Sequence, residues 1–249
     1  LNNSPPLNME PRWFGPHVAY TMAKFGMSMC VLGMAEEFKS AGIAVNELGA
    51  KRVVVMAPNY QAGRDAVAGF KRTYKGEIAE EIYTKLDQAD FSVELARVRS
   101  LAPDAIFQFH PGGAGINLTK QFANSGLDGK IKMITPIYSM DERMLAATGT
   151  AGKGFYLSSL WSADLDNAQN RHFVDAFTKA YNRAPTAYAA QAYDTANLIG
   201  TALKAAGGDI AGKPDAFRDA LRRADFPSVR GKFKFGPNQH PVQDWYLLH

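Results

Sequence analysis

The stretch Arg52-Val53-Val54-Val55-Met56-Ala57-Pro58-Asn59-Tyr60 decides the fold class of this chain. Its unbroken apolar run, Val53–Ala57, has the length of a strand that is buried on both faces, as in a parallel sheet. Pro58-Asn59-Tyr60 then predicts a turn into a helix that extends from about Ala62 to Tyr74. A buried strand followed directly by a helix is the repeating unit of a parallel α/β sheet.

The same strand–helix unit recurs downstream as far as residue 160. Further strands are expected at Ile78–Thr84, Ala105–Phe109, Lys132–Thr135 and Phe155–Ser159, with helices at Phe91–Leu101, from the Gly112-Gly113 loop to Asn124, and from Glu142 to Ala147. Buried strands that alternate with helices of roughly 10–15 residues predict a parallel sheet with right-handed crossovers.

The pattern differs on either side of this region. Before it, we expect loop in residues 1–16, a helix from His17 to Ser40 that stops at Ala41-Gly42, and a short strand at Ile43–Val45. After it, the sequence predicts three helices without intervening strands and then one antiparallel strand pair: Asn170–Tyr181, Thr186–Ala206, Pro214–Arg223, and Val229–Phe235 with Val242–Leu248. Helices added to a finished α/β unit indicate a second, incomplete lobe.

Composition excludes several classes of function. The 249 residues carry a net charge of only +4, and Lys and Arg alternate with Asp and Glu, which argues against a nucleic-acid partner. The single cysteine, Cys30, excludes an intramolecular disulfide and a multi-cysteine metal site, and we expect no metal. No stretch approaches the ~20 apolar residues of a membrane span. No signal peptide is visible, and a chain that begins at Leu1 is expected to be a processed product or a fragment.

Tyr20 and Lys24 lie four residues apart and therefore on one face of the predicted N-terminal helix. A lysine ammonium favours the phenolate form of a neighbouring tyrosine, which suits the pair to proton transfer. Tyr-x-x-x-Lys also occurs by chance in many helices, so an ordinary surface pair is the alternative. With Ser4 placed 16 positions before Tyr20, the segment from Asn3 to Asn46 resembles the catalytic segment of short-chain dehydrogenases/reductases, in their hydroxysteroid-dehydrogenase-like branch.

This resemblance implies that Ser4 orients a substrate carbonyl, Tyr20 acts as acid and base, and Lys24 holds the cofactor ribose. That family also needs a Rossmann half with a glycine-rich loop for the pyrophosphate. The glycine-rich loop present here, Gly112-Gly113-Ala114-Gly115, does not have the dinucleotide spacing. We therefore expect neither a cofactor nor enzyme activity, and a dehydrogenase fragment that uses Tyr20 and Lys24 is kept as an alternative.

Roughly residues 48–249 resemble a different family, the periplasmic solute-binding proteins of branched-chain amino-acid ABC transporters, the Leu/Ile/Val-binding type with the type I fold. The resemblance rests on the order and spacing of five stretches: Arg52 to Asp65, Asp90-Phe91-Ser92, Pro103-Asp104-Ala105-Ile106-Phe107, Ala192-Tyr193-Asp194 and Val229-Arg230-Gly231-Lys232-Phe233. It implies a periplasmic protein that binds a small solute and delivers it to the membrane permease of an importer.

Ligands of open α/β sheets bind outside the carboxyl ends of the strands. The candidate ligand residues at those ends are Tyr60, His110, Gly112, Gly113, Tyr138 and Trp161. Each has a structural alternative: a turn aromatic for Tyr60, a loop histidine for His110 and a packing residue at the hinge for Trp161.

This chain differs at one position from the members of that family that bind amino acids, and this difference predicts the kind of solute. Where they carry an acid for the ligand ammonium, this chain has Ile137 or Tyr138, and Asp141 and Glu142 have the pattern of a first helical turn. An unpaired ammonium would be costly to bury. The sequence therefore predicts a carboxylate or an aromatic acid as the solute, and weak or no binding of simple amino acids.

We divide the chain into four segments: a dehydrogenase-like fragment at 1–46, a complete ligand-binding lobe at 47–162, helices of an incomplete lobe at 163–227, and strands at 228–249 that return to the complete lobe. The expected fold is type I periplasmic-binding-protein-like α/β with a foreign N-terminal helix. The expected protein is a truncated and fused solute-binding component. Its incomplete lobe exposes a face that the helix His17–Ser40 would cover in part, or through which two copies of the chain would pair. A recombined chain without native activity is the remaining alternative.

Overall fold

The computed structural model describes residues 38–237 and 239–249. The described chain falls into two units. The sheet unit consists of the described residues up to Ser159 together with Trp245–His249, and the helical unit consists of Leu160–Asp244. The chain therefore leaves the sheet unit after Ser159 and returns to it after Asp244.

The sheet unit is built on a six-stranded sheet with the order β2-β1-β3-β4-β5-β8. Its strands are β1 (Arg52–Pro58), β2 (Glu77–Thr84), β3 (Ala105–Gln108), β4 (Lys132–Pro136), β5 (Tyr156–Ser159) and β8 (Tyr246–Leu248). The first five are parallel, and β8 joins β5 in the antiparallel direction. All of Val53–Ala57 is buried, as the continuous apolar run predicts. The predicted α/β class is confirmed.

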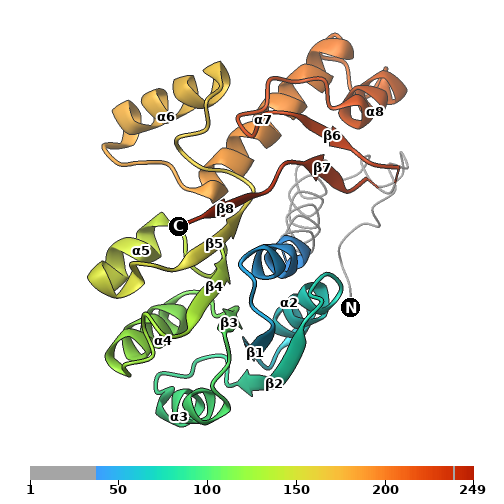
Figure 1. Ribbon diagram of the computed structural model, residues 1–249. Coiled ribbons are helices and arrows are strands. Elements are labelled where there is room, and N and C mark those ends of the chain that lie inside the picture. The colour runs from blue at the N-terminus through green and yellow to red at the C-terminus, as the bar shows by residue number, and fades with distance from the viewer. Residues whose placement is uncertain (1–37, 238) are drawn as a thin grey trace. The chain divides into compact units, whose positions relative to one another are not determined.

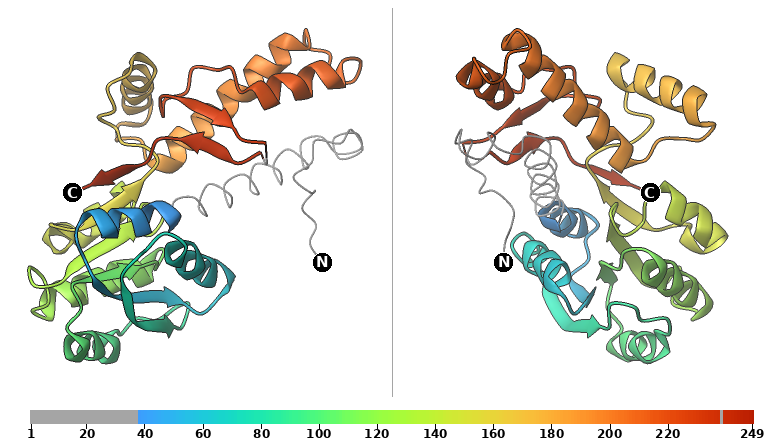
Figure 2. Two further views of the ribbon diagram at one scale, coloured as in Figure 1. Left: turned by 45° about the vertical axis from the view of Figure 1, so that its right-hand side comes forward. Right: turned by 180° about the vertical axis from the view of Figure 1, so that it is seen from behind.

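Helices cover both faces of this sheet. One face carries α2 (Gln61–Lys71) and the helical residues 38–47. The other face carries α3 (Ser92–Leu101), α4 (Gly113–Asn124) and α5 (Glu142–Thr148), which continues into the short 3-10 helix η2 (Gly149–Gly152). Figures 1 and 2 show α3, α4 and α5 side by side along their face, an arrangement that right-handed crossovers produce when β3, β4 and β5 follow in order.

The segment around Gly42 differs from the sequence prediction. Residues 38–47 are helical, so the predicted stop at Ala41-Gly42 and the predicted strand at Ile43–Val45 are both wrong. A Cβ at Gly42 would lie 2.4 Å from the Thr73 hydroxyl oxygen and 2.6 Å from the Phe70 carbonyl oxygen. Glycine is needed here because the helix approaches α2 closely, and not because the helix ends. The rest of the predicted helix, residues 17–37, lies outside the described residues.

The helical unit contains α6 (Ala168–Tyr181), α7 (Ala187–Ala205), α8 (Pro214–Arg223) and a two-stranded antiparallel sheet of β6 (Phe233–Phe235) and β7 (Pro241–Gln243). Asn167 and Thr186 cap the first turns of α6 and α7 with their side chains, and Pro214 begins α8. A small apolar core joins α7 to α8; its fully or nearly fully buried members are Ala202, Ala206, Phe217, Ala220 and Leu221.

The end of the chain also departs from the prediction. We expected one strand pair, Val229–Phe235 with Val242–Leu248. In the structure β6 pairs only with β7, and β8 belongs to the sheet of the other unit. The alternation of exposed and half-buried residues breaks between Trp245 and Tyr246, which are both half-buried. This break divides the predicted second strand into β7 and β8.

Among the described residues, no helix is long and apolar enough to cross a membrane. Within the same residues, no three His, Cys, Asp or Glu side chains are grouped as metal ligands would be.

Candidate functional site

Five of the six predicted ligand residues lie at one edge of the sheet unit. Tyr60 follows β1, His110, Gly112 and Gly113 follow β3, and Tyr138 follows β4. These strands are neighbours in the sheet and run in parallel, so their carboxyl ends meet at the same edge. The sixth residue, Trp161, belongs to the helical unit.

The glycine loop after β3 presents the N-terminus of α4. Gly112 precedes the helix with a φ of +67°, a conformation that favours glycine, and no side chain caps the first turn. Gly112 and Gly113 are exposed, and a Cβ at either would meet nothing within 4 Å. The first amide N–H groups of a helix lack partners within the helix and carry partial positive charge. The N–H groups of this loop are therefore suited to donate hydrogen bonds to an oxygen atom of an anionic or polar ligand.

Tyr60 is the half-buried aromatic residue at this edge. It lies immediately before α2 in extended backbone conformation and makes no side-chain cap. Burial raises the pKa of its phenol, so the hydroxyl stays protonated at neutral pH. The side chain offers an aromatic surface together with a hydrogen-bonding hydroxyl, a combination that suits a small aromatic or polar solute.

The loop after β4 is buried and ends in a helix cap. Tyr138 is only 4% exposed. Asp141 accepts hydrogen bonds from the backbone N–H groups of Arg143 (3.1 Å) and Met144 (2.9 Å), and its other oxygen lies 3.2 Å from the Arg143 guanidinium. Asp141 is therefore the N-cap of α5 and Glu142 lies in its first turn, so the predicted helix start at these two acids is confirmed, and the Asp141 carboxylate is already engaged.

The structure places His110 in the core instead of on the surface of the loop. Its side chain is fully buried and contacts Phe91 edge to face, with 5.3 Å between ring centroids. Its two ring nitrogens lie 3.0 Å from the Thr84 hydroxyl and 3.1 Å from the Gln108 amide oxygen. Desolvation by burial lowers the pKa of His110 to about 3, so the ring is neutral at physiological pH.

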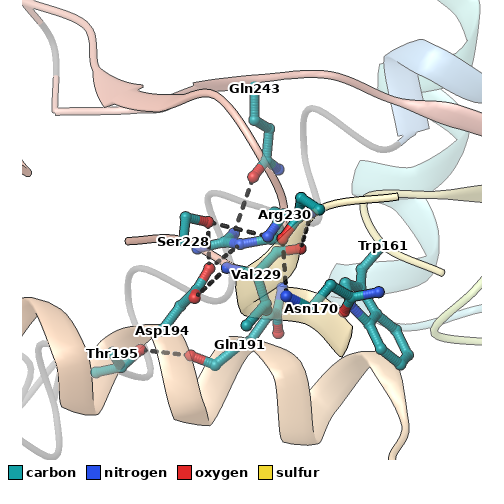
Figure 3. Close-up of polar contacts among 10 residues, drawn as sticks. Trp161, Asn170, Gln191, Asp194, Thr195, Ser228, Val229, Arg230 and Gln243 are labelled. Atoms are coloured by element: carbon teal, nitrogen blue, oxygen red, sulfur yellow. Dashed lines mark hydrogen bonds and ion pairs between the residues drawn. The ribbon is translucent and has the colours of Figure 1, made fainter. Parts of the chain in front are cut away.

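Trp161 is likewise fully buried, in the helical unit. Its indole N–H donates to the side-chain oxygen of Asn170 at 2.6 Å. The Asn170 amide nitrogen donates in turn to the backbone carbonyls of Ser162, Ala163 and Leu165. These bonds fix the segment that follows Ser159, where the chain leaves the sheet unit. Figure 3 shows Asn170 beside Trp161.

A second polar group in the helical unit joins two stretches that the sequence analysis used only for the family resemblance. Asp194 accepts hydrogen bonds from the Ser228 hydroxyl (2.6 Å), the Val229 amide (2.9 Å) and the Arg230 guanidinium (2.8 Å). Arg230 also donates to the Gln243 side-chain oxygen at 2.8 Å (Figure 3). Asp194 on α7 thereby holds the turn that precedes β6.

Sequence reasoning missed the hydrogen-bond partners of His110 and Trp161, namely Gln108, Thr84 and Asn170. A signal was present for Gln108, which ends the apolar run Ala105-Ile106-Phe107 and had to find a hydrogen-bond partner inside the sheet. No comparable signal marked Asn170, because Asn at a helix start is also expected as an ordinary capping residue.

The parallel sheet with helices on both faces, and a second unit that the chain enters and leaves, define the class: an α/β protein with the type I periplasmic-binding fold. The chain belongs to the periplasmic binding protein family, whose model matches residues 12–249. This match begins inside the segment 1–46 that also resembles the dehydrogenases.

Solved structures support the same assignment. A solute-binding protein of an ABC transporter from R. palustris, in complex with benzoate, is 34% identical with a TM-score of 0.79. One from Rhodopseudomonas palustris BisB5, in complex with 3,4-dihydroxybenzoic acid, is 35% identical with a TM-score of 0.72. The matches cover 86% of this chain but only 59% and 60% of those proteins. The chain thus spans about three fifths of the length of these structures.

Curated relatives match a shorter part of the chain. The hydroxysteroid dehydrogenase-like protein 2 of Danio rerio is 54% identical over 78 residues, which are 31% of this chain and 18% of that protein. The Homo sapiens protein of the same name is 65% identical over 54 residues, 22% of this chain and 13% of that protein. The chain therefore spans less than a fifth of these relatives.

Proposed function

We propose that this chain is the solute-binding component of an ABC-type importer and that its solute is an aromatic carboxylic acid. Support comes from the two solute-binding proteins that are 34% and 35% identical to it and hold benzoate and 3,4-dihydroxybenzoic acid. Both matches cover 86% of the chain.

The observation that carries the choice of an acid over an amino acid is the engagement of Asp141. This acid is the nearest one in sequence after the β4 loop, and it is 3% exposed and bound to two backbone amides and to Arg143. Binding a ligand ammonium would require breaking these contacts or burying the ammonium without a partner. A carboxylate solute needs no such acid.

In the proposed complex, the Tyr60 ring contacts the aromatic ring of the solute, and the amides that follow Gly112 and Gly113 donate to one of its oxygen atoms. This division of roles matches the chemistry of the two loops, since one supplies an aromatic surface and the other supplies uncapped N–H groups. Tyr138 and Trp161 are both buried, and their roles as ligand contacts stay predictions.

The test is an NMR titration of the full chain with benzoate, 4-hydroxybenzoate and leucine, read from the amide signals of residues 59–61 and 112–115. We expect the two aromatic acids to shift these signals and leucine to leave them in place. Tyr60→Ala should weaken the benzoate shifts, whereas Tyr83→Ala, which removes a 40% exposed tyrosine from β2, should not. Leucine binding tighter than benzoate binding would refute the proposal.

The family assignment also supports a location and a macromolecular partner. We propose a periplasmic location and a membrane permease as the macromolecular partner. We also propose that the segment 47–162 acts as the ligand-binding lobe together with the returning strand β8, the part of 228–249 that joins its sheet, and that two copies pair through the helices of 163–227. Sedimentation of the purified chain at several concentrations tests the pairing: a mass that stays at one copy throughout would contradict it.

We further propose that the chain binds without catalysing a reaction, since members of the periplasmic binding protein family are typically non-enzymatic. The alternative, a short-chain dehydrogenase fragment, has the part-length similarity to the hydroxysteroid dehydrogenase-like proteins in its favour. Its residues Ser4, Tyr20 and Lys24 lie outside the described residues. Enhanced NADH fluorescence on addition of the chain, abolished by Lys24→Met, would favour the dehydrogenase alternative.

A further inference from the structure

A continuous chain of buried polar side chains joins three strands of the sheet unit. Thr84 ends β2, Gln108 ends β3, His110 follows β3, and Thr135 lies on β4. All four are at most 3% exposed. The links measure 3.0 Å from Thr84 to His110, 3.1 Å from His110 to Gln108, and 2.8 Å from Gln108 to Thr135. We call these four residues the polar chain.

The hydrogen-bond directions in the polar chain follow from its two ends. The Gln108 amide nitrogen donates to the Thr135 hydroxyl, so the Gln108 oxygen is left to accept from Nδ1–H of His110. Nε2 of the neutral His110 is then an acceptor, and the Thr84 hydroxyl is its donor. The Lys85 carbonyl, at 3.2 Å, is a competing acceptor for the Thr84 proton. A buried His110 nitrogen without a donor would cost stability, so the bond to Thr84 orients the ring.

The same histidine is tied to the glycine loop through its backbone. A Cβ at Gly115 would lie 2.1 Å from the His110 carbonyl oxygen, so the first turn of α4 rests directly on the His110 peptide. Between His110 and Gly113 stand only Pro111, whose ring restricts φ, and Gly112. The orientation of the His110 ring and the position of the α4 N-terminus are therefore closely coupled.

We propose that His110 is a positioning residue that acts through Gly112 and Gly113 and does not itself touch the solute. Thr84, Gln108 and Thr135 hold its ring, the ring holds the peptide beneath α4, and the peptide sets where the first amides of α4 point. The part concerning solute affinity rests on the proposed function; the part concerning the loop does not.

Thr84→Val tests the proposal in the full chain, because valine keeps the shape of threonine and replaces the hydroxyl with a methyl group that cannot form a hydrogen bond. We expect the amide signals of Gly112, Gly113 and Ala114 to move in the solute-free protein and the Kd for benzoate to rise about fivefold, the equivalent of one hydrogen bond. Thr84→Ser, which restores the hydroxyl, should return both to wild type. Thr135→Val should shift the same amide signals in the same direction by a smaller amount. This variant replaces Thr84→Val as the test if Thr84→Val does not fold.

Thr148→Val is the matched control. It also removes a buried hydroxyl of the sheet unit, one that donates to the Leu145 carbonyl at 2.8 Å, and should leave loop signals and Kd unchanged. Unmoved loop amides in Thr84→Val would overturn the proposal, as would moved amides with an unchanged Kd, or a nuclear Overhauser effect between the His110 ring and benzoate. If wild type binds no aromatic acid while Thr84→Val still moves the loop, the proposed function fails and the positioning of the loop stands.

Discussion

The carboxylate of Asp194 accepts a hydrogen bond from the Arg230 guanidinium at 2.8 Å, and both side chains are buried within the helical unit. The contact joins α7 to the turn before β6, two segments that are 36 residues apart. A buried ion pair is held in place by its additional hydrogen bonds, here from Ser228 and Val229. Both oxygen atoms of the Asp194 carboxylate are therefore hydrogen-bonded.

Asp194→Asn should therefore destabilise the helical unit strongly, because it leaves the buried Arg230 cation without its counter-charge. The expected loss is on the order of 3 kcal/mol in the free energy of unfolding. Asp219→Asn is the control, since Asp219 and its partner Arg222 are about half exposed, and it should cost less than about 1 kcal/mol. Hydrogen exchange of the α7 amides measures both. Equal losses in the two variants would contradict the structural role of the Asp194–Arg230 pair.

Glycine replacements should have opposite signs at two helical positions. Gly115→Ala places a Cβ 2.1 Å from the His110 carbonyl oxygen, so α4 must move, at a cost of about 1–3 kcal/mol. Gly200→Ala lies within α7 and meets nothing within 4 Å, so it should stabilise α7 by about 1 kcal/mol through helix propensity. Urea unfolding followed by the amide signals of each unit measures both changes. A neutral Gly115→Ala would show that the close approach does not exist.

The main elements of the sheet were predictable because their signals are local. The runs Val53–Ala57 and Ala105–Phe107 are buried on both faces, and their unbroken apolar composition predicts that burial. The edge where ligands bind then follows from topology, since parallel strands place their carboxyl ends together. Tyr60 and the Gly112-Gly113 loop could be placed at that edge without any knowledge of side-chain contacts.

Features that depend on contacts distant in sequence could not be predicted. His110 looked like a loop histidine because its partner Thr84 lies 26 residues away, and Gln108 finds Thr135 at 27 residues. Gly42 looked like a helix stop because a glycine needed for close packing against Phe70 has the same local sequence signal.

The buried His110 predicts that the sheet unit loses stability in acid. Burial lowers the pKa of His110 to about 3, below the unfolded value near 6.5. The unfolded state therefore binds the proton first, so the contribution of His110 is complete above about pH 6.5 and is lost as the pH falls towards 3. The slope that His110 adds to the pH dependence of the free energy of unfolding cannot exceed about 1.4 kcal/mol per pH unit, the value for one proton.

His110→Gln should flatten this part of the pH dependence, even though it lowers the overall stability. His172→Gln, on an exposed position of α6 in the other unit, should leave it unchanged. Urea midpoints of the β1 amide signals, measured between pH 4 and pH 7, give the slope. The same slope in wild type and His110→Gln would place the acid sensitivity on other groups.

Asp141 gives a test that separates a helix cap from a ligand-binding acid. Asp141→Ala removes the acceptor for the Arg143 and Met144 amides and should cost about 1–2 kcal/mol in the free energy of unfolding. Asp141→Asn keeps an acceptor oxygen and should recover most of that loss, because asparagine caps helices about as well as aspartate. In both variants, benzoate should shift the amide signals of Gly112 and Gly113 as it does in the wild type, because the Asp141 carboxylate caps α5 and does not contact the solute. A folded Asp141→Asn that no longer responds to benzoate would show instead that the charge itself is used in binding.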